Sequence, residues 1–485
     1  MILSPPTGPR AARPTFTPRS LLPRSRAAWR WSALMASLAL AGCVNLAPDH
    51  VRPEPAVPRA GTEAAVDAAS LDWHAVFLDD RLRGTVDLAL RQNRDLRVAV
   101  LQIEQSRAAF RQTDAQRLPT LNASGGATRS GAAGQVAQQV SLQLALSSYE
   151  LDFFGRVRNL SASAEQSLFA TIESRRSVQI SLVAETASAW LTWAADLERQ
   201  RLALQTLESR ERTLALTRRR HELGAVSGLV LAQAQTSLES ARADVAAYPA
   251  TIAQDRHALE LLIGMALPAA LEPNASDALA TVSRLVDLPA GVPSSVLQRR
   301  PDVLSAEHAL IASQADIGAA RAATFPSISL TASAGTGSTA LSGLFKSGSG
   351  TWSFGPSVSL PIFDGGARRA AVAQSEAGRD IALARYDKAV QTAFREVADA
   401  LAVRATLADR LAAQQALLAS TERQLRLAET QYRVGSTTQL DLLDAQRSLV
   451  DAQQSLIALR LAEQLNRIAL YKVLGGGWQA GDERS

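Results

Sequence analysis

The chain has 485 residues, a formal net charge of +5 and a single cysteine. Six arginines and no acidic residue lie within residues 1–42, so the remainder contains 45 basic and 46 acidic side chains and is close to neutral. This balance argues against a nucleic-acid partner, and a lone cysteine excludes a disulfide within the chain.

Residues 1–42 have the organisation of a lipoprotein signal peptide. Their arginines precede an apolar run of about 12 residues, which suits a signal h-region and is too short to span a bilayer. The lone cysteine, Cys43, directly follows a Leu-Ala-Gly segment, as in a bacterial lipobox, where cleavage leaves an acylated N-terminal cysteine. Val44, in place of an aspartate, favours the outer membrane over the inner one. The alternative is an ordinary buried cysteine.

Residues 43–75 are predicted to form a lipid-anchored, extended N-terminal tether. Most of this segment is rich in proline, alanine and aspartate and has little periodicity, a composition that favours an extended linker. Several acyl chains anchor a protein firmly where one does not. We therefore expect the tether to hold the chain at the membrane.

Residues 76–264 are predicted to form a first structural repeat. Its second strand is indicated by four aliphatic residues between 140 and 146 that alternate with polar or small ones. Its long helix contains no proline and would reach roughly 100 Å before it ends at Gly224. Pro249 is expected to kink the return helix. The predicted elements are helix 78–116, a strand beginning near 119, strand 140–152, helix 156–221 and a return helix ending near 263.

Residues 293–475 are predicted to repeat this plan. A proline-rich equatorial connector, 265–292, precedes them, and a C-terminal tail, 476–485, follows. The second strand of this repeat places Trp352, Phe354, Val358 and Leu360 on one side. The predicted elements are helix 294–323, strand 326–334, a Gly/Ser loop 335–350, strand 352–363, helix 367–433 and a return helix 438–474.

The two repeats are copies of one pattern. Three glycines recur at a separation of 211 residues: Gly155 and Gly366, Gly224 and Gly435, Gly264 and Gly475. The last helix has a heptad stripe, which indicates close helix packing; its members are Leu442, Ala445, Leu449, Ala452, Leu456 and Leu459. A flanking stripe indicates a second packed side and consists of Leu443, Val450 and Ile457. A duplicated chain supplies similar units, from which an oligomer builds something close to a ring.

The four strands constrain the assembly. Each has about ten residues, the length of a tilted transmembrane strand. Four strands cannot close a barrel and open sheet edges cannot lie in lipid, so the strands must be pooled between chains. Two chains would give eight strands, which side chains plug, and three would give twelve, enough for a pore. The alternative is a soluble β-ribbon joined to a coiled coil.

The sequence shows no motif of catalysis or of metal binding. HExxH, paired CxxC, Walker A and GxSxG are absent, and the Gly/Ser stretch 335–350 has no lysine placed to cradle a phosphate. We therefore expect no enzymatic activity, no cofactor and no metal site. The histidines lack the spacing of ligands and are His50, His74, His221, His257 and His308.

At this point the chain resembles the TolC-like outer-membrane efflux proteins, and within them the lipidated NodT/OprM-like branch. The resemblance covers residues 43–478. It is carried by residues 292–330, by LPIFDGGARR at 360–369 with its counterpart YELDFFGRVR at 149–158, and by the helical-tip segment 431–453.

The resemblance implies a mostly α fold with transmembrane β structure. In a homotrimer, four strands from each chain would form a 12-stranded outer-membrane β-barrel, continuous with a long periplasmic α-helical barrel. The implied partners are a periplasmic adaptor (membrane fusion) protein, an inner-membrane pump of the resistance–nodulation–division type and outer-membrane lipid.

The resemblance also implies a gate at the periplasmic tip. Carried onto this chain, the gate consists of Asp441, Asp444 and Tyr432, while Gly224 and Gly435 mark the turns that contact the adaptor. Threefold symmetry would place six carboxylates around one axis, where like charges disfavour full ionisation and attract cations. The alternatives are solvated helix-face acids and glycines that only reverse the helices.

Two positions depart from the family pattern. Some members have an arginine two residues after the turn glycine, where this chain has Thr437, and some have an acid where this chain has Val230. We therefore expect a closed state with fewer ion pairs, which depends more on packing and on the two aspartates.

The predicted function is an outer-membrane exit duct of a tripartite efflux system. It would passively export drugs or other small toxic compounds, and the pump would supply the energy. Two alternatives stay open at this point: a type I protein-secretion duct with the same fold, and a non-conducting periplasmic structural lipoprotein.

Overall fold

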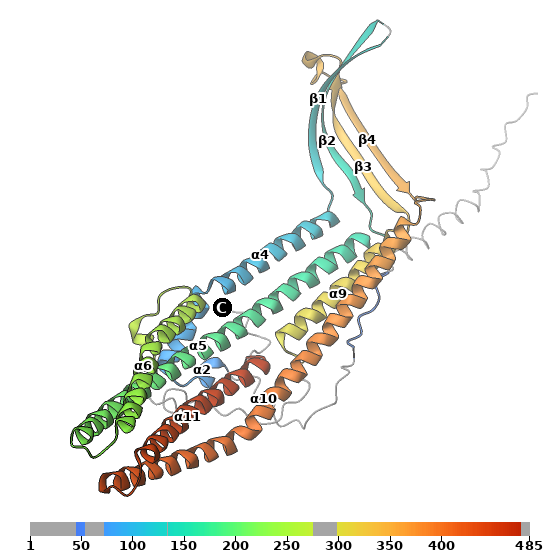
Figure 1. Ribbon diagram of the computed structural model, residues 1–485. Coiled ribbons are helices and arrows are strands. Elements are labelled where there is room, and N and C mark those ends of the chain that lie inside the picture. The colour runs from blue at the N-terminus through green and yellow to red at the C-terminus, as the bar shows by residue number, and fades with distance from the viewer. Residues whose placement is uncertain (1–44, 54–71, 133, 275–297, 477–485) are drawn as a thin grey trace, which may run out of the picture.

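The computed structural model describes residues 45–53, 72–132, 134–274 and 298–476. Figure 1 shows an elongated molecule with a sheet at one end and long helices that lead away from it to two helical tips. The predicted signal peptide and Cys43 lie outside the described residues, as do most of the tether, the connector and the tail. None of the described helices has a stretch long and apolar enough to cross a membrane.

The elements follow the order expected of two repeats. The first repeat contains α2 (Trp73–Val76), α3 (Asp80–Gln92), α4 (Arg94–Asp114), β1 (Leu121–Ala132), β2 (Gln135–Glu150), α5 (Arg156–Glu222) and α6 (Gly228–Ile263). The second contains α9 (Pro301–Ala322), β3 (Ser327–Ser338), β4 (Gly350–Ser359), α10 (Ala367–Val434) and α11 (Gln439–Val473). The two long helices are confirmed: α5 has 67 residues and α10 has 68, or about 100 Å each. Helix α6 continues through Pro249.

The first predicted helix, 78–116, was wrong as a single element, because Asn93 divides it into α3 and α4. Asn93 has ψ 133°, outside the helical region, and its side chain accepts a hydrogen bond from the Leu96 N–H at 2.7 Å. Asparagine is a preferred N-cap because its side chain satisfies a free N–H of the first helical turn. The Asn93 amide also donates to the Leu262 carbonyl at 2.8 Å, which ties the break to α6.

The helix predicted to begin at 294 begins instead at Pro301, after a turn at 298–300. Proline suits the first helical position, and it disfavours helical backbone in the residue before it. Residues 294–297 lie outside the described part of the chain. The strand predicted to reach 363 ends at Ser359, because Pro361 lacks an N–H and Asp364 accepts hydrogen bonds from the first N–H groups around α10.

The sheet is antiparallel throughout, in the order β1-β2-β3-β4. Leu144 pairs with Ala334, which in turn pairs with Trp352, so these three residues share one face. Leu144 and Trp352 are exposed in the single chain. Strands β1 and β4 form the two edges of the described sheet, and β4 tolerates Pro356 because an edge strand need not donate every N–H.

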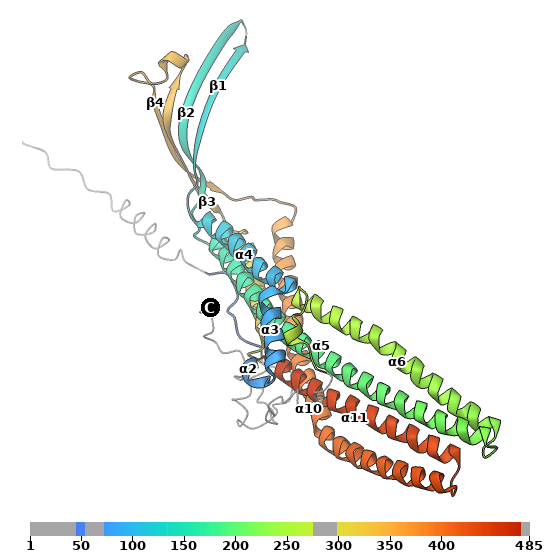
Figure 2. The ribbon, with the colours of Figure 1, turned by 90° about the vertical axis from the view of Figure 1, so that its left-hand side faces the viewer.

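The main core lies midway along the molecule, where α3, the middle of α5 and the end of α11 meet. Trp190 is fully buried there, and its indole N–H donates to the Leu271 carbonyl at 3.0 Å. The predicted heptad stripe of α11 is confirmed, since its residues are buried or partly buried against the neighbouring helices. Figure 2 shows the two hairpins, α5–α6 and α10–α11, extending from this core.

Candidate functional site

The two helical tips carry the predicted turn glycines. Gly224 and Gly435 have φ angles of 74° and 79°, a left-handed conformation that favours glycine, and each N–H closes the turn onto a preceding carbonyl. A Cβ at either position would meet no atom within 4 Å, so both turns are open to solvent. Large aliphatic side chains are exposed beside both turns, a feature not singled out from the sequence: Leu223, Leu229, Val434 and Leu440.

Asp441 forms the capping box of α11. Its Oδ2 accepts hydrogen bonds from the Thr438 hydroxyl at 2.6 Å and from the Thr438 N–H at 3.0 Å. In return the Asp441 N–H donates to the Thr438 hydroxyl at 3.2 Å. The hydrogen bonds from the Thr438 hydroxyl, then from Thr437 and the Thr438 N–H, lower the pKa of the Asp441 carboxyl. Within one chain, Asp441 is therefore both a helix cap and a firmly ionised group.

Thr437 supplies a neutral partner to the predicted gate. Its hydroxyl donates to Asp441 Oδ2 at 2.8 Å, from the position two residues after the turn glycine. Val230 lies in the first turn of α6, where its N–H donates to the Ser227 hydroxyl at 3.4 Å. The hydroxyl groups of Thr437 and Thr438 thus both bind the Asp441 carboxylate, whereas Val230 contacts only its own helix start at Ser227 in the described hydrogen bonds.

Asp444 lies one turn further along α11 and is more than half exposed, with a carboxylate oxygen 3.7 Å from Arg447. It lines a groove of about 1010 Å³ between α6 and α11, with α5 on the third side. The two aspartates are three residues apart near the start of α11, and each has its own partner: Asp441 binds Thr437 and Thr438, and Asp444 lies near Arg447. Only Asp444 lines the groove.

Tyr432 connects the two hairpins rather than facing solvent. It is buried, and the Arg220 guanidinium of α5 lies 4.6 Å from its ring centroid. This geometry is a cation–π contact. Its hydroxyl is buried without a hydrogen-bond partner among the described residues. A second link, missed from the sequence, joins the buried Arg210 of α5 to the Gln446 amide oxygen of α11.

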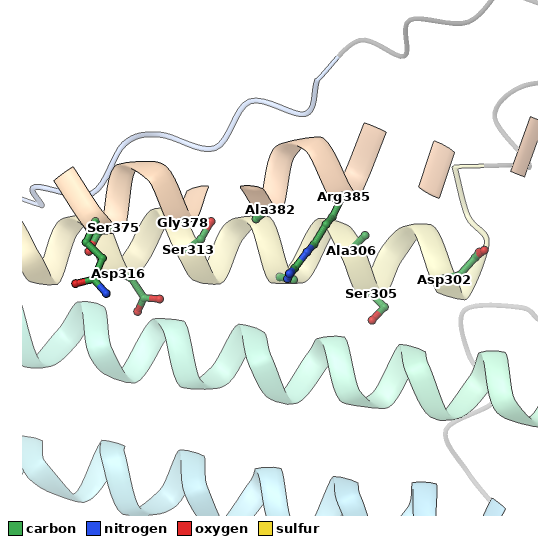
Figure 3. Close-up of a pocket in the computed structure, with 11 residues that line it drawn as sticks. Asp302, Ser305, Ala306, Ser313, Asp316, Ser375, Gly378, Ala382 and Arg385 are labelled. Carbon is green, nitrogen blue, oxygen red and sulfur yellow. The ribbon is translucent and has the colours of Figure 1, made fainter. Parts of the chain in front are cut away.

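A polar groove lies between α9 and α10 (Figure 3). It encloses about 720 Å³, and its charged lining residues are Asp302, Asp316 and Arg385, set among serines and small residues. These side chains give the groove a hydrogen-bonding surface rather than a largely apolar one. No residue of this groove was singled out from the sequence.

The described part of the N-terminal segment, 45–53, lies on a different face of α9. Arg52 forms a two-pronged ion pair with Glu307, with distances of 2.7 and 2.6 Å, and His50 contacts Gln314 at 3.0 Å. Glu307 is nearly buried. At the sheet end of α9, Arg321 donates to the Leu46 carbonyl at 3.5 Å.

A pair of carboxylates lies between α5 and α6. Asp196 is buried and accepts a hydrogen bond from Arg199 at 2.6 Å. Asp255 is partly buried, and its Oδ2 has no hydrogen-bond partner among the described residues. Burial, followed by the hydrogen bond and negative charge of Asp196, raises the pKa of Asp255 to about 6. Sequence reasoning missed this pair because its members lie on different helices.

Comparison with known proteins identifies the same architecture elsewhere. The family model described as "Outer membrane efflux protein" matches residues 85–265 and 292–476. The probable efflux pump outer membrane protein TtgC of Pseudomonas putida is 42% identical over 465 residues, covering 92% of this chain and 95% of TtgC. The cation efflux system protein CusC of Escherichia coli O6:H1 is 41% identical over 454 residues, covering 91% of this chain and 97% of CusC.

A solved structure of an outer membrane channel is also similar to this chain. The chain resembles the open state of the Neisseria gonorrhoeae MtrE outer membrane channel with a TM-score of 0.83 and 38% sequence identity. The match covers 90% of this chain and 98% of MtrE. The predicted fold class is therefore confirmed, since the helical body with its four-stranded sheet is that of outer-membrane channels.

Proposed function

We propose that this outer-membrane efflux channel is the passive exit duct of a tripartite pump, since the chain belongs to the outer membrane efflux protein family. The observation that carries the proposal is one continuous body in which two helices of about 100 Å lead from a four-stranded sheet to paired helical tips. Three chains would pool twelve strands into a barrel and twelve helical segments into a tunnel. The duct itself needs no energy source.

The proposed partners are argued from the helical tips. At the tips, the exposed leucines and valine beside Gly224 and Gly435 offer apolar contacts to a periplasmic adaptor. The adaptor would connect the tips to an inner-membrane pump of the resistance–nodulation–division type. TtgC is described as a probable efflux pump protein and CusC as a cation efflux protein; for this chain we favour drugs or other small toxic compounds as cargo.

Single-channel recording in planar bilayers tests the duct. The purified oligomer is expected to conduct, whereas a structural lipoprotein would not. An oligomer that never conducts, even after Asp441 and Asp444 are both changed to alanine, would remove the proposal. A deletion strain separates the two duct functions, because an efflux duct protects cells from dyes and detergents, and a type I duct releases one secreted protein.

The gate prediction concerns Asp441 and Asp444 together with the buried Tyr432. Changing both aspartates to alanine is expected to raise conductance and to lower cation selectivity, because it removes six carboxylates from the mouth of a trimer. The matched control, Glu422→Ala with Glu429→Ala, removes the same charge from α10. Equal effects of the two double variants would show that Asp441 and Asp444 are ordinary surface acids.

The lipid anchor is supported by where the described N-terminal segment lies. Leu46, three residues after Cys43, is bonded to Arg321 at the end of α9 that leads into β3, which is the membrane end of the body. We expect radiolabelled palmitate on the native chain and none on Cys43→Ser, which should still assemble because the barrel anchors itself. A native chain without label would contradict lipidation.

A further inference from the structure

The described N-terminal segment, 45–53, follows one side of α9. It runs antiparallel to the helix, since Leu46 lies at Arg321 and Arg52 lies at Glu307. At Gly318 a Cβ would lie 2.7 Å from the Ala47 Cβ, so the glycine lets the segment lie close against the helix. The contacted positions of α9 form one stripe and are Glu307, Gln314, Gly318 and Arg321.

The polar groove between α9 and α10 opens on a different side of α9. The α9 residues that line it form a second stripe and are Asp302, Ser305, Ala306, Ala309, Ser313 and Asp316. At 3.6 residues per turn, the centres of the two stripes are about 140° apart around the helix. Ser305 is bonded to Ala170 of α5 at 2.9 Å, and Val303 packs against Tyr386 of α10. The segment and the groove therefore lie on opposite faces of the layer that α5, α9 and α10 form (Figure 1).

The N-terminal segment indicates which face of this layer is outside. Leu46 lies three residues after Cys43, whose proposed acyl chains must reach the bilayer around the barrel. The interior of a twelve-stranded barrel holds water and offers no lipid. In the proposed duct the segment therefore lies on the outer face, and the α9–α10 groove opens into the lumen.

The groove is hollow because both helices have small side chains there. Helix α9 contributes Ala306 and Ala309, and α10 contributes Gly378 and Ala382. The volume of about 720 Å³ lies in the range of small-molecule sites. A polar groove holds a ligand more weakly than an apolar pocket does, because little apolar area is buried. Weak sites suit a duct, since cargo must leave as readily as it enters.

Two charged side chains of opposite sign lie in the groove without a partner. Asp302 is already paired with Arg300 at 2.7 Å. Asp316 of α9 and Arg385 of α10, by contrast, have no ion pair or hydrogen bond among the described residues. Figure 3 shows Arg385 extending across α9 beside Ala306, ten residues before Asp316. The two charges are thus separated by about 15 Å along the groove.

We propose that the α9–α10 groove is a weak cargo site on the lumen wall of the duct, which binds organic molecules with an ammonium group at one end and a carboxylate at the other. Asp316 binds the ammonium group. Arg385 binds the carboxylate, for which its planar guanidinium supplies two parallel N–H groups. Ser313, which lies between them along α9, adds a hydroxyl to the lining. The proposal rests on the proposed duct.

Cysteine labelling in planar bilayers tests the lumen placement. Ser313→Cys puts a thiol in the groove. Asp387→Cys puts one two residues after Arg385, about 200° around α10 and away from the groove. A positively charged methanethiosulfonate reagent is expected to reduce the single-channel current of Ser313→Cys only. The currents of Asp387→Cys and of the native chain, which both retain Cys43, should not change. An unchanged current for Ser313→Cys would overturn the placement of the groove in the lumen.

Block of the open channel tests the class of ligand. 8-Aminooctanoate carries one charge of each sign at neutral pH. The controls 1,8-diaminooctane and octanedioate have the same chain length and two like charges. The zwitterion is expected to block the native channel at a lower concentration than either control, because only its two ends match Asp316 and Arg385.

Charge variants assign the block to the groove. Asp316→Asn and Arg385→Gln are each expected to weaken block by 8-aminooctanoate about two- to fivefold, the range for one exposed ion pair. The matched control Asp387→Asn removes a carboxylate from the other side of α10 and should leave the block unchanged. Equal block by the three compounds, or equal effects of the three variants, would overturn the site while the conducting duct stands. An oligomer that never conducts would overturn the duct and the site together.

Discussion

Asp255 offers a direct test of the contact between α5 and α6. Replacing it with asparagine keeps the size of the side chain and removes a charge that the site disfavours, because the carboxyl is partly buried and lies beside Asp196. Arg199 is the cation that partly offsets the negative charge of the two carboxylates. We expect Asp255→Asn to stabilise this contact at neutral pH.

The magnitude follows from the pKa of Asp255, which is about 6 in the folded chain and close to 3.9 in an unfolded one. A difference of about two units corresponds to about 3 kcal/mol, and partial exposure to water reduces it to about 1–2 kcal/mol. Because the folded pKa is raised, the protonated Asp255 carboxyl costs the folded chain no stability below about pH 4. As the pH rises through about 6 the carboxyl ionises, and that stability is lost. The gain from asparagine is therefore largest above pH 6.

Hydrogen–deuterium exchange of the α6 amides near residue 255 measures this contact locally. At pH 7.5 the variant is expected to be protected about 5- to 30-fold more than the native chain, and at pH 5 the free-energy gain should be about half as large. Asp244→Asn, an exposed carboxylate on the same helix, should show no such gain. Equal gains at both pH values, or none, would refute the reasoning.

Two further substitutions test particular backbone and charge contacts. Gly264→Ala should destabilise the chain by about 2–4 kcal/mol, because φ is 83° and a Cβ would lie 2.7 Å from the Gln92 carbonyl oxygen. The control Gly224→Ala, at a glycine with a similar φ and open space around it, should cost about 1 kcal/mol. Equal losses of stability in thermal unfolding of the two variants would contradict the clash at Gly264. Arg300→Met should cost about 2–3 kcal/mol, since the buried guanidinium binds Asp302, Glu396 and the Val473 carbonyl; an unchanged unfolding midpoint at one fixed scan rate would argue against this junction.

Local patterns predicted most of the elements, because a helix or strand of this kind is specified by residues that follow one another. The ends of α5 and α10 were located to within one residue by glycines that cap helices in the left-handed conformation. The break at Asn93 was missed. A single polar residue within a helical pattern has no periodic signal, and here its role depends on the Leu262 carbonyl of a distant helix.

The candidate site divides in the same way. From the sequence alone came the duplication, the paired tips and the placement of Asp441 and Asp444 beside the second turn. Only the tertiary structure decided that Tyr432 lies beneath Arg220 and that Asp196 meets Asp255. These contacts join side chains on different helices. Their energies arise from burial and from neighbouring charges, which exist only once the helices have packed.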